Sequence, residues 1–293
     1  MSNDNLHQAL KNKNDEFYTR LIDIQKELQH YKSFLKNKKV YLNCDDLTSN
    51  FWNFFVDEFN NFELQSVTST SLEGIKRTYN GEIIVEESLK EGGSFYSNEC
   101  IEIMKTQDVI ITNPPFSLFR KLIILLTDLN KDFIIIGNEN TLSSVEVFPL
   151  FKNKKIFLGY NSVKEFYKPD GSTQTFGNIK WFTSFNIDKE YPKIDFIKSY
   201  SEAEYPMYDN YEAINVDKVK DIPKDYKGIM GVPISFLVKC NPAEFNILGI
   251  ATGSSNKHNL NFTVPHTSNP LEKGGCCVLK GVRKYTRVFI QRV

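Results

Sequence analysis

The chain has 293 residues, of which 41% are hydrophobic and 25% are charged, as in globular proteins that bury a core without needing disulfides or metal ions. Its 36 basic and 36 acidic residues balance to a formal net charge of zero, which excludes a strongly basic protein that coats nucleic acid but leaves room for a local basic face. The five cysteines and four histidines show no disulfide or metal-ligand spacing, and no apolar run approaches the ~20 residues that span a bilayer, so we expect a reduced, cytoplasmic protein without a structural metal or a membrane anchor.

Strands and helices alternate through the first half of the chain. Apolar residues recur at helical spacing over residues 20–35, and a stripe of phenylalanines predicts a second helix over residues 49–60. Two segments, 108–112 and 132–137, each hold an apolar run after a leading aspartate, and they are typical of strands buried in a parallel sheet. The other predicted elements are strands at 40–44, 62–69, 81–87 and 154–159, and helices at 97–105, 117–129 and 144–151.

This alternation predicts an α/β fold with right-handed βαβ units and a mostly parallel, doubly wound sheet. After about residue 160 the composition changes, and Asn, Asp, Lys, Tyr, Gly and Pro become frequent. Strand-like segments return at 178–186, 245–251 and 284–290. We therefore expect an α/β core over residues 1–186, followed by an irregular, β-rich region over residues 187–293.

The tetrapeptide Asn113-Pro114-Pro115-Phe116, here named the NPPF turn, follows the buried strand 108–112. Open α/β sheets bind ligands at the carboxyl ends of their strands. The two prolines fix φ and remove two N–H donors, and the residue before a proline is held extended. The turn is therefore rigid, and it displays an amide side chain and backbone carbonyls without competing donors. The simpler alternative is a tight strand-to-helix turn without chemistry.

Such a turn suits an exocyclic amine like N6 of adenine. The amide oxygen of Asn113 and a backbone carbonyl can accept both amine hydrogens, which makes the nitrogen lone pair available for attack on a methyl sulfonium. Catalysis by such a site comes mainly from positioning and preorganised dipoles. Phe116 can stack on the face of an extruded base.

With these residues in view, the sequence resembles adenine-specific amino-methyltransferases, and most closely the EcoRI-type DNA adenine methyltransferases. The resemblance runs from about residue 14 to the end of the chain. It implies a Rossmann-like methyltransferase fold, S-adenosylmethionine as cofactor, and transfer of its methyl group to a flipped-out adenine. The stretches that carry it include NDEFYTRLIDIQKEL, VYLNCDDLTSNFWNFF, VIITNPPFSLFRKLI, FIIIGNENTL, GNIKWFTSF and YEAINVDKVKDIPKDYKGIMGVPISFL.

The resemblance also implies roles for individual residues. The NPPF turn supplies the catalytic residues Asn113, Pro114, Pro115 and Phe116. The N-terminal segment DEFYT (15–19) closes over the methionine end of the cofactor, and the alternative is an N-cap and first turn of the helix 20–35. The loop after strand 40–44 forms the first cofactor loop, and the alternative is a plain helix N-cap. The implied cofactor contacts are Phe17, Tyr18, Thr19, Asn43, Cys44, Asp45, Asp46, Ser49, Asn50, Ser94, Phe95 and Asn113.

The sequence departs from the family pattern at several cofactor positions. Leu47 stands where the family has proline, Ser94 stands where relatives tend to have aspartate, and no acidic residue for the ribose hydroxyls follows strand 62–69. On the substrate side, Phe116 and Asn138 are implied to position the base. Trp181 is a candidate wall of the base pocket, and the alternative is a core tryptophan.

The last 14 residues hold five basic side chains and no acid. Lys284 and Arg287 are candidate contacts to DNA phosphates, and the alternative is an edge strand protected by charge. The polar stretch 253–262 is either a recognition loop or a plain surface loop. We expect double-stranded DNA as the partner, a monomer, and a possible cognate restriction enzyme. The alternatives are methylation of RNA adenine or of a protein glutamine amide, or a binding module without catalysis.

Overall fold

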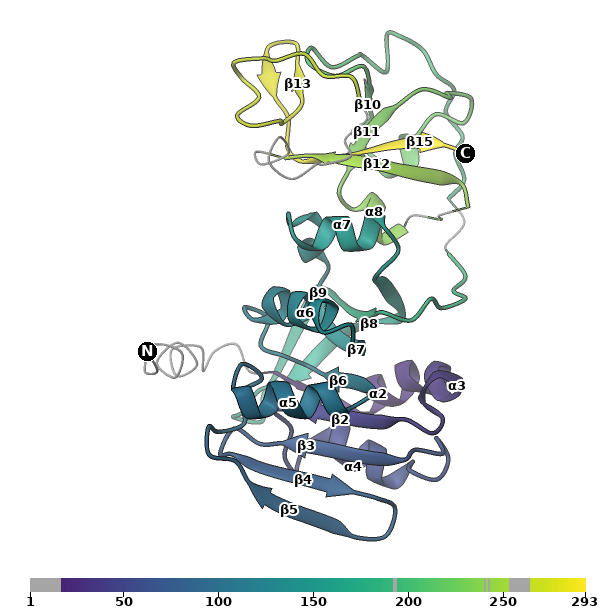
Figure 1. The fold of residues 1–293 in the computed structure, drawn as a ribbon. Coiled ribbons are helices and arrows are strands. Elements are labelled where there is room, and N and C mark those ends of the chain that lie inside the picture. Colours follow the sequence, from purple (N-terminus) through teal and green to yellow (C-terminus); the bar gives the residue numbers. More distant parts are fainter. Residues whose placement is uncertain (1–16, 192–193, 240, 242, 253–263) are drawn as a thin grey trace. The chain divides into compact units, whose positions relative to one another are not determined.

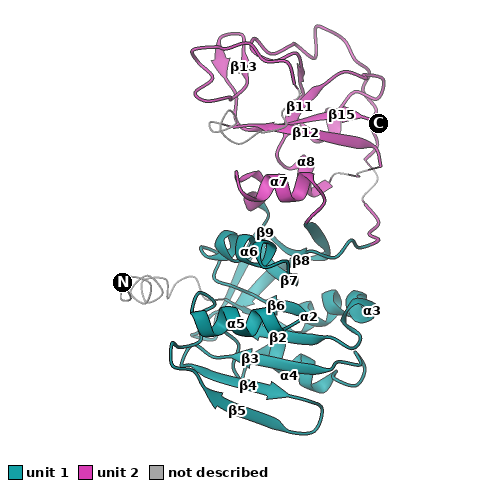
Figure 2. Cartoon of the chain, viewed as in Figure 1, with its two compact units in different colours: residues 1–139, 156–187 teal, residues 140–155, 188–293 magenta. Residues whose placement is uncertain are grey.

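The computed structural model describes residues 17–191, 194–239, 241, 243–252 and 264–293. The chain divides into two compact units (Figure 2). Unit 1 comprises residues 1–139 and 156–187, and unit 2 comprises residues 140–155 and 188–293. The short segment 140–155 therefore packs with the C-terminal part of the chain, although it lies between strands of unit 1 in the sequence.

Unit 1 is built on a nine-stranded sheet with the strand order β1-β8-β9-β7-β6-β2-β3-β4-β5 (Figure 1). The four central strands, β7-β6-β2-β3, are parallel, and the outer pairs are antiparallel. The expected parallel sheet is thus limited to the centre, because direct hairpins join β3 to β4, β4 to β5, and β8 to β9. The strands are β1 Tyr18–Thr19, β2 Lys39–Asn43, β3 Ser66–Thr70, β4 Ile75–Tyr79, β5 Ile84–Ser88, β6 Val109–Thr112, β7 Asp132–Asn138, β8 Phe157–Tyr167 and β9 Thr173–Thr183.

Helices cover both faces of this sheet. On one face, Trp181 of β9 contacts Phe51 of α4, at 6.0 Å between ring centroids, within a core that also includes α2 and α3. On the other face, the next residue of β9, Phe182, packs on Phe119 of α6 at 4.8 Å. Because successive side chains of a strand point to opposite faces of the sheet, neighbouring residues of β9 pack into the apolar layers on both sides. The helices of unit 1 are α2 Leu21–Leu28, η1 Gln29–Tyr31, α3 Lys32–Leu35, α4 Asn50–Asp57, α5 Asn98–Thr106 and α6 Phe119–Asp128, and η2 Glu139–Ser143 runs from unit 1 into unit 2.

Unit 2 holds a four-stranded sheet with the order β10-β11-β15-β12 and a separate two-stranded ladder, β13-β14. Tyr211, Cys277 and Phe289 belong to its apolar core. The expected β-rich C-terminal region is therefore present. Its elements are α7 Val147–Lys152, β10 Ile214–Asn215, η3 Val219–Asp221, β11 Met230–Pro233, α8 Phe236–Lys239, β12 Phe245–Ala251, β13 Val278–Leu279, β14 Val282–Arg283 and β15 Arg287–Arg292.

Two predicted helix starts are confirmed by their caps. Ser49 Oγ accepts a hydrogen bond from Phe51 N at 3.1 Å, and Ser97 Oγ accepts one from Cys100 N at 3.2 Å. The helix predicted over residues 20–35 is instead three short pieces, since a 3₁₀ turn at Gln29–Tyr31 separates α2 from α3.

Candidate active site

The NPPF turn leaves the carboxyl end of β6 among the parallel central strands. All four residues of β6 are buried. After the turn, the carbonyl oxygen of Pro115 accepts hydrogen bonds from the N–H groups of Leu118 and Phe119, at 2.8 and 3.1 Å. The predicted order of strand, turn and helix is confirmed, but α6 begins at Phe119 because residues 116–118 still form a turn.

The side-chain amide of Asn113 is held in one orientation. Its Nδ2 donates a hydrogen bond of 2.6 Å to the carbonyl oxygen of Phe17. Since a carbonyl can only accept, the amide nitrogen must face Phe17 and Oδ1 must be turned away from it. Oδ1 is buried and has no hydrogen-bond partner among the described residues. A buried acceptor without a donor is rare in folded proteins, and it marks a place where a donor on a ligand would fit.

Four phenylalanine rings gather at the NPPF turn. Phe17 stacks on Phe116 with ring centroids 5.4 Å apart and an angle of 20° between the planes. Phe166 and Phe176 meet Phe116 edge to face, at 5.8 and 5.4 Å. The rings of Phe17 and Phe176 are 4.9 Å apart. Phe116 is therefore part of a cluster of aromatic rings, with Phe17 stacked on its ring.

The β8–β9 hairpin brings two of these rings to the site. The pairing of β9 with β7 ends at Asn138↔Ile179, whereas its pairing with β8 continues to Tyr167↔Thr173. The hairpin thus extends past the carboxyl end of β7. Sequence reasoning does not single out Phe166 or Phe176, because the pattern predicts only short strands there. Residues 173–179 show no strict alternation of polar and apolar residues, so the sequence carried no clear signal for the extension of this hairpin.

The N-terminal segment, residues 17–20, is fastened to three elements around the site. Its short strand pairs with β8, and its Phe17 carbonyl accepts from Asn113. The carbonyl oxygen of Thr19 accepts a hydrogen bond of 2.8 Å from Asn50 Nδ2 at the start of α4. Thr19 is buried, and its hydroxyl has no partner among the described residues, whereas Tyr18 is half exposed.

The loop after β2 follows the same edge of the sheet. Asn43 is buried and donates from Nδ2 to the hydroxyls of Tyr41 and Thr70, at 2.9 and 3.1 Å. Its carbonyl oxygen accepts from Thr112 Oγ1 at 2.8 Å, which ties the end of β2 to the residue before the NPPF turn. Cys44 adopts a positive φ of 62° and so turns the chain sharply out of the strand.

Asp45 is the candidate cofactor residue with the most perturbed carboxyl group. Its carboxylate accepts hydrogen bonds from Ser49 Oγ and, at 3.5 Å, from Thr112 Oγ1. Burial raises the pKa of Asp45 to about 7, the charge of Asp46 acts in the same direction, and the two hydroxyl donors oppose the shift. Asp46 is exposed and caps the backbone N–H of Thr48 at 2.7 Å, which is a structural role.

Ser94 and Phe95 lie in the segment that approaches the ends of β2 and β3. The carbonyl oxygen of Gly93 accepts from Cys44 Sγ at 3.4 Å. A Cβ added to Gly93 would stand 1.8 Å from the carbonyl oxygen of Ser71, so only glycine fits this close approach. Ser94 is exposed and Phe95 is buried. Of these two, only Ser94 is open to a ligand in this structure.

The two remaining base-site candidates differ in accessibility. Asn138 is partly exposed at the carboxyl end of β7, and its Oδ1 accepts from Asn178 Nδ2 at 3.1 Å. Trp181 has 0% exposure and packs in the core against Phe51. This placement corresponds to the core alternative for Trp181.

The two candidate phosphate contacts both have a partner inside unit 2. Arg287 is buried, and its Nη2 donates to Asp217 Oδ1 at 3.1 Å. Lys284 Nζ lies 3.9 Å from the same carboxylate oxygen. Arg287 is therefore an internal structural residue, because phosphate binding would require it to leave both its buried position and its carboxylate. The proposed recognition loop, 253–262, lies outside the described residues.

Within the described part of the chain, no three His, Cys, Asp or Glu side chains cluster in a way that could hold a metal ion. The helices of that same part include none that is long and apolar enough to cross a membrane.

Comparison with known proteins gives consistent matches over almost the whole chain. The family described as adenine-specific methyltransferase EcoRI matches residues 5–83 and 70–293. The chain is 37% identical to the Type II methyltransferase M.EcoRI of Escherichia coli, over 86% of this chain and 90% of the relative. It is 33% identical to the Type II methyltransferases M.MgeORF184P of Mycoplasma genitalium, over 98% of each chain, and M.MpnI of Mycoplasma pneumoniae, over 98% of this chain and 97% of the relative. No solved structure matches significantly.

Proposed function

The chain belongs to the EcoRI family of adenine-specific methyltransferases, and from this premise we propose how its residues perform the reaction. The protein is a DNA adenine methyltransferase. The methyl group passes from S-adenosylmethionine to the exocyclic N6 of an adenine that has been turned out of the duplex. Extrusion is required because a base within the stack cannot present N6 to a group buried in the protein.

The buried Oδ1 of Asn113 is the observation that carries this proposal. It is an acceptor without a donor among the described residues, and its orientation is set by the bond from Nδ2 to Phe17. The amine of adenine offers two hydrogens. Oδ1 of Asn113 accepts one of them, and a backbone carbonyl of the NPPF turn accepts the other.

These two hydrogen bonds account for the chemistry that the protein must supply. Bound S-adenosylmethionine provides a methyl group on a positively charged sulfur. The acceptors would draw the amine nitrogen away from planarity, so that its lone pair becomes available for attack on that methyl group. The carbon–sulfur bond would break as the new nitrogen–carbon bond forms, and S-adenosylhomocysteine would leave with the bonding electron pair. No strong base is required, since the N6 proton becomes acidic as the new bond forms and is released to solvent. Catalysis then rests on positioning and on dipoles fixed in advance.

Aromatic residues complete the proposed base site. Phe116 provides the stacking surface directly after the catalytic asparagine. Phe166 and Phe176 meet its ring edge to face and bound the space beside it. Asn138 and Asn178, joined by a hydrogen bond at the neighbouring strand end, supply polar groups for the edge of the base.

The residues around β2 fit S-adenosylmethionine, and we propose a Rossmann-like methyltransferase fold for unit 1. Parallel strands with their carboxyl ends at one edge form the usual ligand position of such folds. Asp45 would hold the cofactor's ammonium group. The hydroxyl of Thr19, buried and without a partner among the described residues, would donate to its carboxylate. Ser94 remains the candidate near the adenosine end.

We further propose that residues 1–186 hold the catalytic core and that residues 187–293 contribute recognition of double-stranded DNA. The monomeric state and the cognate restriction enzyme remain predictions.

The direct test is to incubate the purified protein with duplex DNA and S-adenosylmethionine carrying a deuterated methyl group. Mass spectrometry of the digested nucleosides should find the label on N6-methyladenine, and Asn113→Ala should remove it. Modification-sensitive sequencing of DNA from expressing cells would give the sequence context. Parallel incubations with RNA and with protein substrates test the two alternatives. Label on RNA or on glutamine but not on the DNA, or no transfer at all, would contradict the proposal.

A further inference from the structure

Unit 2 contains a short hairpin, β13–β14, with a tightly defined turn. Val278 pairs with Arg283 and Leu279 with Val282, which leaves Lys280 and Gly281 as a two-residue loop. Both loop residues have positive φ, 50° and 71°, as a type I′ turn requires. The carboxylate of Asp209 accepts hydrogen bonds from both of their N–H groups, at 3.0 and 2.8 Å. The hairpin is thus held in one conformation at its tip.

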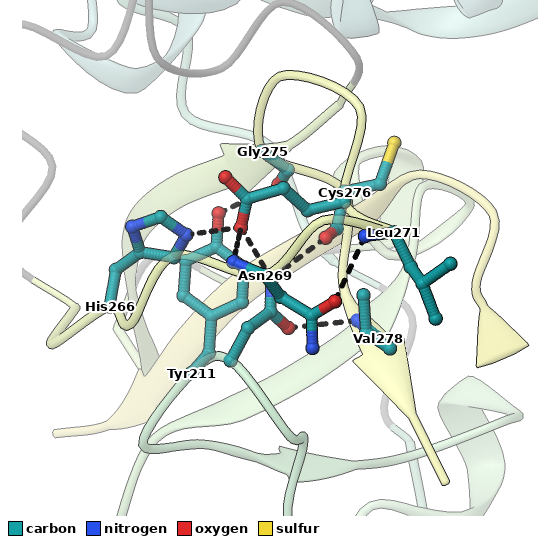
Figure 3. A network of polar contacts seen from close by, with 9 residues as sticks. Tyr211, His266, Asn269, Leu271, Gly275, Cys276 and Val278 are labelled. Atoms are coloured by element: carbon teal, nitrogen blue, oxygen red, sulfur yellow. Dashed lines mark hydrogen bonds and ion pairs between the residues drawn. The ribbon is translucent and has the colours of Figure 1, made fainter. Parts of the chain in front are cut away.

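A buried polar network fixes the base of the same hairpin (Figure 3). Asn210 is 1% exposed, and it accepts from Val278 N at 2.8 Å and donates to the Cys276 carbonyl at 3.0 Å. It also donates to Glu272, whose carboxylate is 2.6 Å from His266 Nε2. Such a network, with partners for each group, holds the chain rigidly.

The held hairpin presents cations and an aromatic ring to solvent. Lys280 and Arg283 are exposed, Val282 is 63% exposed and Tyr285 is 89% exposed. An aromatic side chain exposed to this degree at the end of a rigid hairpin has no packing role within the described chain. The nearby acids are engaged: Asp209 holds the turn, and Asp217 pairs with Arg287.

The structure separates these cations from the other basic residues of the C-terminal stretch. Arg287 and Lys284 lie close to Asp217. Arg292 donates to the Pro223 carbonyl and lies over the rings of Phe196 and Phe245. Among the five basic residues of this stretch, only Lys280 and Arg283 are exposed.

We propose that the β13–β14 hairpin, with Tyr285, is a DNA contact that enters a groove of the duplex. This inference rests on the proposed function, which supplies DNA as the partner. A two-stranded ribbon is narrow enough for the major groove. Lys280 and Arg283 contact phosphates on its walls, and Tyr285 packs its ring against a base or sugar.

The charge contribution is tested by the double variant Lys280→Asn, Arg283→Gln. Asparagine tolerates the positive φ at position 280, so the turn is kept. Affinity for duplex DNA is measured between 50 and 200 mM salt. Two lost phosphate contacts should make the slope of log affinity against log salt less negative by about 2. The matched control is Lys220→Asn, Lys224→Gln, which removes two exposed charges elsewhere in unit 2 and should keep the wild-type slope.

The aromatic contribution is tested separately. Tyr285→Ala should weaken DNA binding by roughly tenfold without changing the salt slope, and Tyr285→Phe should bind like the wild type. A wild-type affinity and slope in the double variant would overturn the proposal, as would equal effects of the control pair. DNA binding is measured without turnover. A protein that binds DNA but transfers no methyl group would therefore contradict the proposed function, while the binding of the variants would still test the hairpin as a DNA contact. A wild type that does not bind duplex DNA would overturn both.

Discussion

Asn113 Nδ2 donates a hydrogen bond of 2.6 Å to the carbonyl oxygen of Phe17, a residue 96 positions earlier in the chain. This contact determines which atom of the amide remains for a substrate. It also couples the N-terminal segment to the NPPF turn, because the ring of Phe17 stacks on Phe116. Displacement of the segment would therefore change both the orientation of the acceptor and the stacking surface.

The first prediction concerns the acceptor itself. Asn113→Ala should lower the rate of methyl transfer by about 10²–10³, the usual effect of removing one preorganised polar group from a reacting centre. Binding of S-adenosylmethionine should be largely retained. Single-turnover transfer to duplex DNA and calorimetric titration of the cofactor measure the two effects.

Asn113→Asp tests the bond to Phe17 separately. A carboxylate keeps an acceptor oxygen but cannot donate to the Phe17 carbonyl, so it should also be strongly impaired. Near-normal turnover in the alanine variant would remove Asn113 from the mechanism. Near-normal turnover in the aspartate variant would show that the orientation of the amide is not needed.

The second prediction concerns the stacking surface. Phe116→Ala should raise the apparent KM for DNA by roughly tenfold, as expected when an aromatic partner of a base is removed. The matched control is Phe185→Ala, since Phe185 is also partly buried and packs against the same core of unit 1. If the control raises KM equally, the effect of Phe116 is structural. Fluorescence of 2-aminopurine at the target position should report weaker capture of the extruded base in the Phe116 variant alone.

The sequence predicts the centre of the fold better than its sides. The strands β6 and β7 are built around short apolar runs, and their type and position are confirmed. In contrast, β4 lies in a polar stretch without a clear pattern, and β5, although its residues overlap the predicted strand 81–87, is exposed along its whole length. Their pairing depends on the edge of the sheet that the buried strands provide, and local residues do not encode it.

The same distinction applies to the site. The role of Asn113 can be predicted from the sequence, because the two prolines that follow it fix the local backbone of the turn. Phe166 and Phe176 are not, because the register and length of the β8–β9 hairpin bring them to the turn. Arg287 was a reasonable phosphate candidate in sequence, yet its partner Asp217 is 70 positions away. Burial and long-range pairing decide whether a cation is available, and neither is visible in a single sequence.

The third prediction concerns pH and the cofactor. Burial raises the pKa of Asp45 to about 7 in the ligand-free protein. Only the ionised carboxylate attracts an ammonium group, so affinity for S-adenosylmethionine should rise several-fold between pH 6 and pH 7.5. Staying below pH 7.5 keeps the cofactor's amine charged. Asp45→Asn should bind weakly at each pH, and an unchanged wild-type affinity across this range would contradict the assignment.

The fourth prediction concerns the effect of the Asp45 carboxyl group on the thermal stability of the protein as pH changes. An aspartate in the unfolded chain ionises near pH 4, whereas folded Asp45 retains its proton up to about pH 7. The folded state therefore binds more protons in this window, and this group's contribution lowers stability as pH rises from 4 to 7. Asp45→Asn lacks that contribution. The difference in Tm between the variant and the wild type should shift in favour of the variant as pH increases from 5 to 8, and a constant difference would contradict it.

The fifth prediction concerns Glu27, a carboxylate with 0% exposure that joins α2 to β8. It accepts hydrogen bonds from Tyr31 OH at 3.0 Å, from Tyr160 N at 2.8 Å, and from the backbone and side-chain nitrogens of Asn161 at 2.7 and 2.9 Å. The β8–β9 register shifts at this place, between Leu158 and Ser162, so the carboxylate satisfies donors that the ladder leaves unpaired.

Each of these partners donates a hydrogen bond to Glu27. In Glu27→Gln, the new side-chain NH2 group would therefore face one of these donors and could not accept its hydrogen bond. We expect the free energy of unfolding to fall by about 1–3 kcal/mol, measured by urea denaturation. Glu63→Gln is the control, because Glu63 forms an exposed ion pair with Lys36 whose loss should change stability by less than about 1 kcal/mol. Burial raises the pKa of Glu27 above its ordinary value, and its hydrogen bonds only partly oppose this shift. A more stable Glu27→Gln protein would mean that burial of the charge outweighs these bonds, and that the bulge in β8 does not depend on a carboxylate.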